Sequence, residues 1–253
     1  MNSQFNTCAT EYHKFRPDYP MALFELLIER FKLSNTSLIA DVGCGTARAS
    51  IAFAQQNIKV IGLDPSLEML QLGRKTSQDL GLQISFLQSS AEEIALSDKT
   101  IDFINCAQAF HWFNSEKAFN EFKRILKPTA GFALYWNNRD QLTASYLAEV
   151  EELITKYNPK YKSGYQSQDW GQIIKDAQLF TDIEFYSFSH SEGLSIEDFI
   201  GLTRSFSYVR NVLSDEDMSL FTNELESLLI KNSVNNQLQL PYQVKLWCAK
   251  ISF

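Results

Sequence analysis

Residues 39–48 read Ile39-Ala40-Asp41-Val42-Gly43-Cys44-Gly45-Thr46-Ala47-Arg48. Apolar residues and an aspartate lead into a Gly-x-Gly turn, after which alanine and isoleucine recur at helical spacing over residues 46–56. This order predicts a buried strand, a tight turn and a helix. Glycine has no Cβ, so the turn can bend sharply and approach a ligand. Because the helix start behind it offers unpaired backbone N–H groups, the stretch predicts a nucleotide site at the carboxyl end of a strand in an open α/β sheet.

The residues around the turn favour one kind of nucleotide. Dinucleotide-binding proteins use Gly-x-Gly-x-x-Gly or Ala, and here the third small position is Arg48. Asp41 is poorly placed for phosphates but well placed for an ammonium group. A second predicted strand, residues 59–63, is followed by Asp64, whose carboxylate suits two ribose hydroxyls. An amine, a ribose and no phosphate together indicate S-adenosylmethionine.

Apolar runs and turn residues predict the remaining elements. Further strands are expected at residues 83–87, 102–107 and 132–136, with helices after Pro65 and over residues 116–126. Five strands alternating with helices predict a parallel sheet with right-handed crossovers. Beyond residue 138 we expect a helix over residues 142–157, a polar loop over 158–170 and a strand over 182–190. Two helices with capping-box-like starts at Ser195 and Ser214 follow, and the last strand covers residues 242–251.

Several stretches in order resemble the class I S-adenosylmethionine-dependent methyltransferases. Residues 41–46 resemble the first motif of that family, residues 62–70 its second, residues 89–92 its adenine-contacting loop and residues 122–131 the turn before its fifth strand. Residues 12–20 and 109–113 are similar to the small-molecule subgroup that contains trans-aconitate methyltransferase.

The resemblance implies a fold class and a division of the chain. The fold is α/β, a Rossmann-like seven-stranded, mostly parallel sheet flanked by helices, with an antiparallel last strand and a helical lid. Residues 1–36 would form an N-terminal segment and helix that cover the site, and residues 37–138 the S-adenosylmethionine-binding core. Residues 139–253 would complete the sheet and supply the substrate lid, within one domain.

Position and resemblance together give the candidate cofactor site. Its expected residues are Tyr12, Arg16, Asp41, Gly43, Cys44, Gly45, Asp64, Pro65, Met69, Ser90, Ala91, Glu92 and Gln108. Some have a second interpretation: Asp64 and Pro65 also suit a helix start, Met69 suits core filling, and Ser90 suits a helix cap. Arg16 has a guanidinium fork for a carboxylate of either the cofactor or the substrate.

The expected acceptor site follows the fourth strand. Its candidate residues are Tyr19, Phe110, His111, Trp112, Asn137 and Tyr208. An aromatic face stabilises a sulfonium cation by about 0.5–2 kcal/mol, although the rings can also serve packing under the lid. His111 is the candidate catalytic residue: it can act as a general base, hydrogen-bond a substrate carboxylate, or be structural.

Composition excludes several classes of protein. The chain has 253 residues, of which 45% are hydrophobic, and a formal charge of −7, so we expect a sizeable core and no nucleic-acid partner. The sequence predicts no signal peptide and no membrane span. Scattered cysteines and histidines predict reduced thiols, no metal and a cytoplasmic location; these residues are Cys8, Cys44, Cys106, Cys248, His13, His111 and His190.

The resulting functional hypothesis is methyl transfer from S-adenosylmethionine to a small molecule, either a carboxylate or another oxygen nucleophile. A carboxylate needs no base, whereas a phenol, enol or amine would benefit from one. The alternatives are a quinone or polyketide O- or C-methyltransferase, and a protein that binds S-adenosylmethionine without catalysis. Arg48 disfavours an NAD-linked oxidoreductase. The protein is expected to be a monomer or a homodimer.

Overall fold

The computed structural model describes residues 16–161 and 168–252. They form two compact units, each made of three segments of the chain. The sheet unit comprises Asp18–Asn137, Gln168–Phe188 and Val244–Phe253, and the helical unit comprises the described parts of Met1–Pro17, Asn138–Ser167 and Ser189–Gln243. Strands β5, β6 and β7 contribute residues to both units.

Seven strands form one sheet in the order β3-β2-β1-β4-β5-β7-β6. Their bounds are β1 Leu38–Val42, β2 Lys59–Asp64, β3 Ile84–Gln88, β4 Ile101–Ala107, β5 Leu126–Arg139, β6 Phe180–Ser195 and β7 Gln237–Ile251. The pairs β1–β2, β1–β4, β2–β3 and β4–β5 are parallel. The first five strands therefore confirm the predicted parallel sheet.

The last strand runs against its neighbour β5. The N–H of Asp140 donates to the carbonyl of Pro241, whereas Gly131 lies against the carbonyl of Ala249. Residue numbers thus fall along β7 as they rise along β5, which is the antiparallel arrangement that was expected. The fold is a Rossmann-like, mostly parallel α/β sheet.

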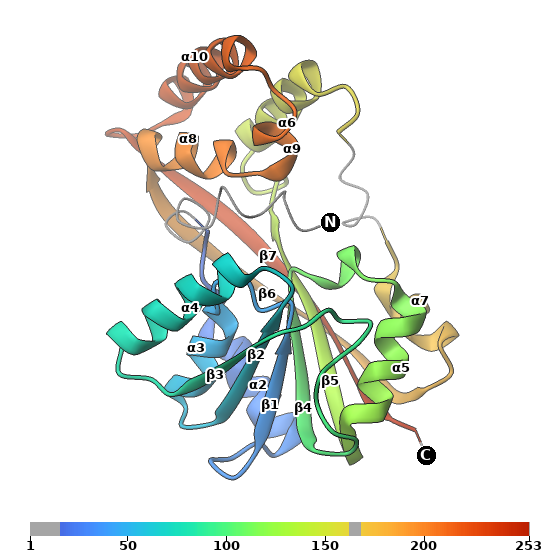
Figure 1. Cartoon of the computed structure of the whole chain (residues 1–253). Helices are drawn as coiled ribbons and strands as arrows, with labels where there is room; N and C mark the ends of the chain where they lie inside the picture. Colours follow the sequence, from blue (N-terminus) through green and yellow to red (C-terminus); the bar gives the residue numbers. More distant parts are fainter. Residues whose placement is uncertain (1–15, 162–167, 253) are drawn as a thin grey trace. The chain divides into compact units, whose positions relative to one another are not determined.

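Ten helical segments accompany the strands in the described part of the chain. They are α2 Met21–Phe31, α3 Arg48–Gln55, α4 Leu67–Asp79, η1 Phe110–Trp112, α5 Ser115–Ile125, α6 Tyr146–Tyr157, α7 Trp170–Asp176, α8 Ile196–Arg204, α9 Ser207–Arg210 and α10 Asp215–Asn232. In the sheet unit, α3 and α4 lie on one side of the strands and α5 and α7 on the other (Figure 1).

Side-chain caps begin several of these helices where the sequence predicts them. Asn114 accepts from the N–H of Lys117 at the start of α5, and Ser195 and Ser214 accept from backbone N–H groups at the starts of α8 and α10. Helix α4 begins at Leu67 rather than Pro65, because Ser66 caps it by accepting from the N–H of Met69. Each cap satisfies a donor that has no partner within its helix.

Three predicted boundaries were wrong. Strand β5 begins at Leu126 instead of residue 132, since Pro128 ends helix α5 but allows the chain to continue extended. Strands β6 and β7 are both longer than predicted. Helix α7 was not predicted; it begins at Trp170, where Asp169 accepts from the N–H of Gln172.

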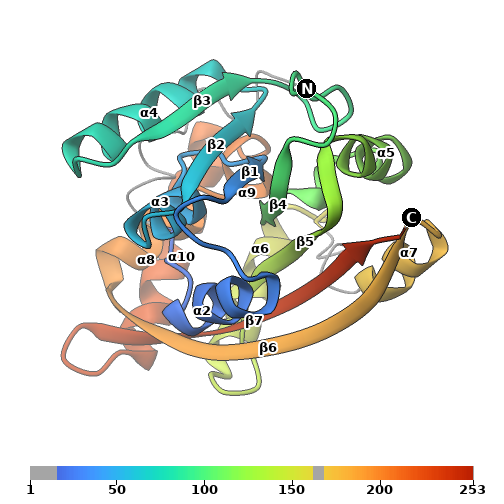
Figure 2. The same cartoon turned by 90° about the horizontal axis from the view of Figure 1, so that it is seen from below.

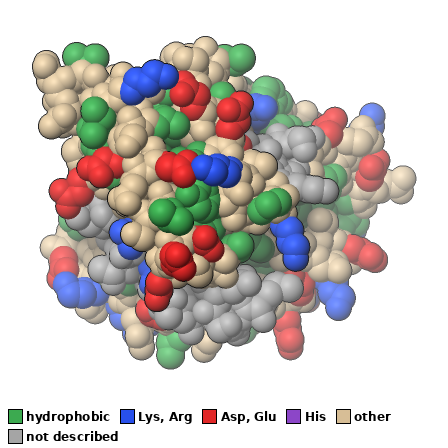
Figure 3. All heavy atoms as spheres, turned by 90° about the horizontal axis from the view of Figure 1, so that it is seen from above, with side chains coloured by type: hydrophobic (Ala, Val, Ile, Leu, Met, Phe, Trp, Pro, Cys, Tyr) green, Lys and Arg blue, Asp and Glu red, His purple; other side chains and the backbone are tan. Residues whose placement is uncertain are grey.

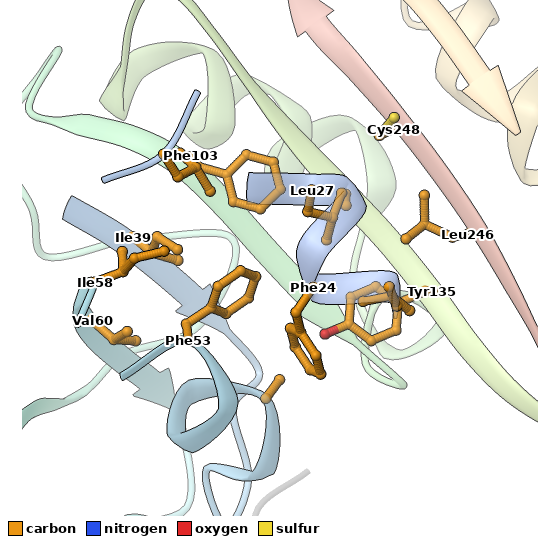
Figure 4. Packing of buried hydrophobic residues seen from close by; sticks show 14 of the residues in the cluster. Phe24, Leu27, Ile39, Phe53, Ile58, Val60, Phe103, Tyr135, Leu246 and Cys248 are labelled. Carbon is orange, nitrogen blue, oxygen red and sulfur yellow. The ribbon is translucent and has the colours of Figure 1, made fainter. Parts of the chain in front are cut away.

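Alternate residues of β5 serve opposite faces of the sheet unit. Tyr135 belongs to the core formed with α2 and α3, where Phe24 and Phe53 meet edge to face at 5.0 Å between ring centroids. Figure 4 shows this aromatic cluster, and Figure 2 shows α2 lying across the strands on that side. Phe132 faces the other way and lies 5.8 Å from the ring of Phe119 in α5.

The helical unit has its own core. It gathers apolar residues of α6, α8 and α10 with the first half of β7, among them Leu147, Val150, Phe199, Leu225 and Leu240, all of which are buried. Each of the two units therefore buries a separate apolar cluster.

Candidate active site

The turn after β1 is built from two glycines with left-handed backbone. Gly43 has φ +72° and Gly45 has φ +53°, a region that residues with a Cβ rarely adopt. A Cβ built on Gly43 would lie 2.5 Å from the Cβ of Ala109 and 3.1 Å from Cζ of Phe113. A Cβ on Gly45 would meet no atom within 4 Å. Close packing thus requires the first glycine, while the second borders open space.

Asp64 joins this turn to the end of β2. One of its oxygens accepts from the N–H of Gly45 at 2.9 Å, and the other accepts from the N–H of Ser66 at 2.8 Å. Burial raises the pKa of Asp64, and the two backbone donors oppose that shift. A carboxylate oxygen can accept more than one hydrogen bond, so each retains capacity for a hydroxyl.

Asp41 is buried in β1 between two side-chain donors. It accepts from the hydroxyl of Ser50 in α3 and, at 2.7 Å, from the amide of Asn105 in β4. Burial raises its pKa to about 6, and the two hydrogen bonds oppose the shift. The expected contact with an ammonium group would therefore be a third contact of this carboxylate. Its two partners, Ser50 and Asn105, are further candidate residues that the sequence did not reveal.

Arg48 ties the segment before α2 to the start of α3. Its guanidinium pairs with Asp18, whose carbonyl accepts from the side-chain amide of Asn137 at 3.3 Å. Next to it, Tyr19 meets Tyr135 edge to face at 4.9 Å. The residue that departs from the dinucleotide pattern thus anchors the segment that was expected to cover the site.

The loop after β3 contains the residues expected near adenine. Ala91 is buried, and Glu92 accepts from the N–H of Asn114 at 2.9 Å. Ser90 forms a bridge with Glu93, so it does not cap a helix in the described structure. Met69 is buried in α4, and the carbonyl of Pro65 accepts from Gln88.

Residues 108–113 leave β4 and pack on the glycine turn. Gln108 has left-handed backbone, with φ +55°. Its backbone N–H donates to the carbonyl of Tyr135 at 2.8 Å, and its side-chain amide donates to the backbone carbonyl of Asn137 at 3.2 Å. Phe110 is fully buried against Phe119, so its ring belongs to the core rather than to an open acceptor surface. Trp112 remains 46% exposed, beside His111.

His111 accepts a hydrogen bond from the indole of Trp136. The distance from Nε1 of Trp136 to Nδ1 of His111 is 3.0 Å. Burial lowers the pKa of His111 to about 4. Because an indole N–H only donates, the imidazole is neutral near pH 7 and carries its proton on Nε2. Spacing along the sequence gives no signal for this contact, since His111 lies in η1 and Trp136 lies in β5, 25 residues further along the chain.

Two other candidates, Arg16 and Tyr208, both contact the ring of Phe206 in the helical unit. The guanidinium groups of Arg16 and Arg139 lie 4.6 Å and 5.0 Å from the centroid of the Phe206 ring, which stacks on Tyr208. Arg139 also donates to Glu151 at 3.1 Å. Tyr12 lies outside the described residues.

Across residues 16–161 and 168–252, no cluster of three or more His, Cys, Asp or Glu residues is arranged to hold a metal ion. Burial raises the pKa of both Cys44 and Cys106, which keeps them as thiols. None of the helices described is long and apolar enough to cross a membrane.

The residues present fit an adenosyl sulfonium ligand. The turn borders open space at Gly45, and the buried hydroxyl of Thr46 has no hydrogen-bond partner among the described residues. The carboxyls of Asp41 and Asp64 lie at the ends of the two neighbouring strands, and they suit an ammonium and a ribose better than phosphates. Thr46 is a further candidate that the sequence did not reveal.

Known methyltransferases share both sequence and fold with this chain. A family model described as a methyltransferase domain matches residues 39–129. An uncharacterized methyltransferase from Schizosaccharomyces pombe is 30% identical over 231 residues, or 89% of this chain and 86% of the relative. A probable S-adenosylmethionine-dependent methyltransferase from Saccharomyces cerevisiae is 28% identical over 181 residues, or 70% of this chain and 58% of the relative.

Solved structures agree on the fold. The YcgJ protein from Bacillus subtilis superposes with a TM-score of 0.57 at 17% identity, covering 92% of this chain and 100% of that chain. The chain belongs to the class I S-adenosylmethionine-dependent methyltransferases. Its cofactor is S-adenosylmethionine, as predicted.

Proposed function

We propose that this enzyme methylates a small molecule on oxygen, with a carboxylate as the first candidate acceptor. The observation that carries the proposal is the packing of residues 108–113 against Gly43, because it puts an imidazole and an exposed indole on the segment next to the cofactor turn. The resemblance of residues 12–20 and 109–113 to the trans-aconitate subgroup supports a small acid as acceptor.

The proposed cofactor contacts follow from the hydrogen-bond capacity of each group. Asp64 accepts from the ribose hydroxyls, Asp41 faces the ammonium, and Met69 and Ala91 line the adenine. The bound cofactor supplies a methyl group on a positively charged sulfur, and transfer to a carboxylate forms one C–O bond while the C–S electron pair stays on sulfur. The chain's own task is then to position the acceptor and exclude water.

Within the helical unit, we further propose that Arg16 and Tyr208 contact a bound carboxylate. The guanidinium of Arg16 lies over the ring of Phe206, which stacks on Tyr208, and Arg139 beside them is paired with Glu151. Guanidinium groups bind carboxylates in a fixed fork geometry, which suits a small acid. On the face shown in Figure 3, acidic side chains lie beside basic ones. The net charge of −7 also favours a small acceptor over a nucleic acid, because binding a nucleic acid requires positive charge.

The test is transfer of labelled methyl from S-adenosylmethionine to a panel of acceptors. The panel contains small di- and tricarboxylic acids, phenols and quinols, with Asp64→Ala as the cofactor-site control. We expect labelled product from an acid, absent in the control, that releases its label as methanol in mild alkali because methyl esters hydrolyse. Alkali-stable label on a phenol or quinol would support the alternative instead. Tight cofactor binding without transfer to any acceptor would contradict the proposal.

A further inference from the structure

The indole of Trp136 is held rigidly behind His111. It is 1% exposed and stacks on Trp170, with 4.5 Å between the ring centroids and 12° between the planes. Trp247 approaches it edge to face at 5.9 Å. Its N–H therefore has a fixed direction, and that direction leads to Nδ1 of His111 at 3.0 Å.

This contact fixes the tautomer of the imidazole. Indole nitrogen donates and never accepts, so Nδ1 must contribute a lone pair and the proton must reside on Nε2. A second proton on Nδ1 would set one N–H against another and break the bond to Trp136. The burial that lowers the pKa of His111 to about 4 acts in the same direction.

A histidine in this state can donate a hydrogen bond but is a poor base. Its basic lone pair is engaged by Trp136, and its other nitrogen already carries a proton. A phenol must lose a proton when its oxygen is methylated, and its pKa of about 10 calls for a base. A carboxylate is ionised at neutral pH and releases no proton on methylation, so it needs only a donor that holds it in place.

We propose that Trp136 is a positioning residue that fixes His111 as a neutral Nε2–H donor, and that this donor holds the acceptor's carboxylate. The proposal rests on the proposed function and narrows its acceptor to a small carboxylic acid. Of the three roles that the sequence left open for His111, it selects the hydrogen bond to a substrate carboxylate over the general base and the structural residue. It also gives a role to Trp136, which the sequence did not mark as a site residue.

The first test determines the tautomer of His111 in the protein without bound cofactor. Nitrogen NMR of protein labelled with ¹⁵N-histidine distinguishes the two neutral tautomers and the cation, and His111→Gln assigns the signal among the three histidines His13, His111 and His190. We expect the Nε2–H form of His111 at neutral pH in wild type, and its loss in Trp136→Phe. Trp247→Phe, which removes the indole that meets Trp136 edge to face, should leave it unchanged. An Nδ1–H tautomer in wild type would overturn the proposal.

The second test reads acceptor binding. Trp136→Phe should raise KM for the acid about 10- to 100-fold, the value of one hydrogen bond to a charged group, while S-adenosylmethionine affinity changes less than about twofold. His111→Gln retains an N–H donor but has no basic nitrogen, whereas His111→Ala has neither, so the loss of kcat should be smaller in His111→Gln than in His111→Ala. Equal losses of kcat in this comparison would overturn the donor role. The His111 variants also test the donor role if Trp136→Phe fails to fold.

The two proposals fail in different ways. Wild type that binds S-adenosylmethionine and methylates phenols but no acid would overturn the inference about His111 and leave an active methyltransferase. Wild type that methylates no acceptor at all would overturn the proposed function, and with it the acceptor assignment, whatever tautomer the spectrum shows.

Discussion

The N–H of Gly45 donates to Oδ2 of Asp64 at 2.9 Å. This bond joins the turn after β1 to the end of β2, although Gly45 and Asp64 are 19 residues apart in the chain. It orients the carboxylate before any ligand arrives, because Ser66 holds the other oxygen at 2.8 Å. A carboxylate held by two backbone donors loses little freedom when it binds a ribose.

Removing the charge at this position should weaken cofactor binding. We expect Asp64→Asn to lower S-adenosylmethionine affinity about 10- to 100-fold, since hydrogen bonds to a charged group contribute about 1.5–3 kcal/mol. Titration calorimetry measures the effect. Asp79→Asn is the matched control, because Asp79 is an exposed residue of α4 paired with Lys75. Equal affinity of Asp64→Asn and wild type would show that the carboxylate does not contact the ligand.

The two glycines of the turn should respond differently to alanine. Gly43→Ala adds a Cβ 2.5 Å from that of Ala109 at φ +72°. We expect a loss of about 2–5 kcal/mol in the free energy of unfolding, the sum of left-handed strain and overpacking. Gly45→Ala meets open space, so it should cost only about 1–2 kcal/mol of stability but reduce cofactor affinity strongly. Urea unfolding and calorimetry separate the two effects, and the reverse pattern would contradict this account of the turn.

Asp41 should make the protein less stable as pH rises. Its pKa of about 6 lies above the usual value of 3.8, so between these values the folded state holds a proton that the unfolded state has released. The stabilisation from this proton is complete below the unfolded-state pKa of 3.8 and is lost as the pH rises through the folded-state pKa of about 6. Relative to Asp41→Asn, wild type should lose about 2 kcal/mol of unfolding free energy from about pH 4.5 to 7.5.

The difference between the two proteins isolates this group, since the other carboxyls titrate alike in both. Urea unfolding at several pH values measures it. The substituted asparagine can be accommodated at position 41. Oδ1 of Asn105 lacks a hydrogen-bond partner among the described residues, so after an amide flip of Asn105 it can accept from the new side-chain amide. A pH-independent difference would mean that Asp41 titrates normally.

The ion pair of Arg48 with Asp18 should contribute only modestly to stability. Asp18 is 77% exposed, and exposed pairs contribute about 0.2–1 kcal/mol. A double-mutant cycle with Arg48→Ala and Asp18→Ala measures their coupling, with Lys75 and Asp79 as a control pair on the surface of α4. We expect a coupling at least as large as that of the control, because Asn137 also holds the backbone of Asp18. Zero coupling would contradict the anchoring role.

Local chemistry made much of the sheet unit predictable. The strand of β1, the glycine turn and α3 follow from apolar runs and from residues that tolerate positive φ. Asn114 begins a helix because its side chain satisfies a backbone donor nearby in the chain. The position of Asp64 follows from the same strand-and-turn pattern, so one end of the candidate site was visible in the sequence.

Contacts between distant residues were not predictable. Nothing local tells that Asp41 receives donors from α3 and β4, or that Trp136 faces His111. The short helix η1 also disturbs the simple periodicity after β4, so spacing did not show that Phe110 would be buried and Trp112 exposed. Helix α7 was missed because seven residues carry too little periodic signal, although Trp170 fixes it in the core.

The most direct test of the central claim is calorimetric titration of the wild-type protein with S-adenosylmethionine, S-adenosylhomocysteine and NAD. The carboxylates at the ends of β1 and β2, together with Arg48 at the third small position, predict micromolar binding of both adenosyl ligands and no binding of NAD. Binding of NAD with no heat from either adenosyl ligand would contradict the account of this site.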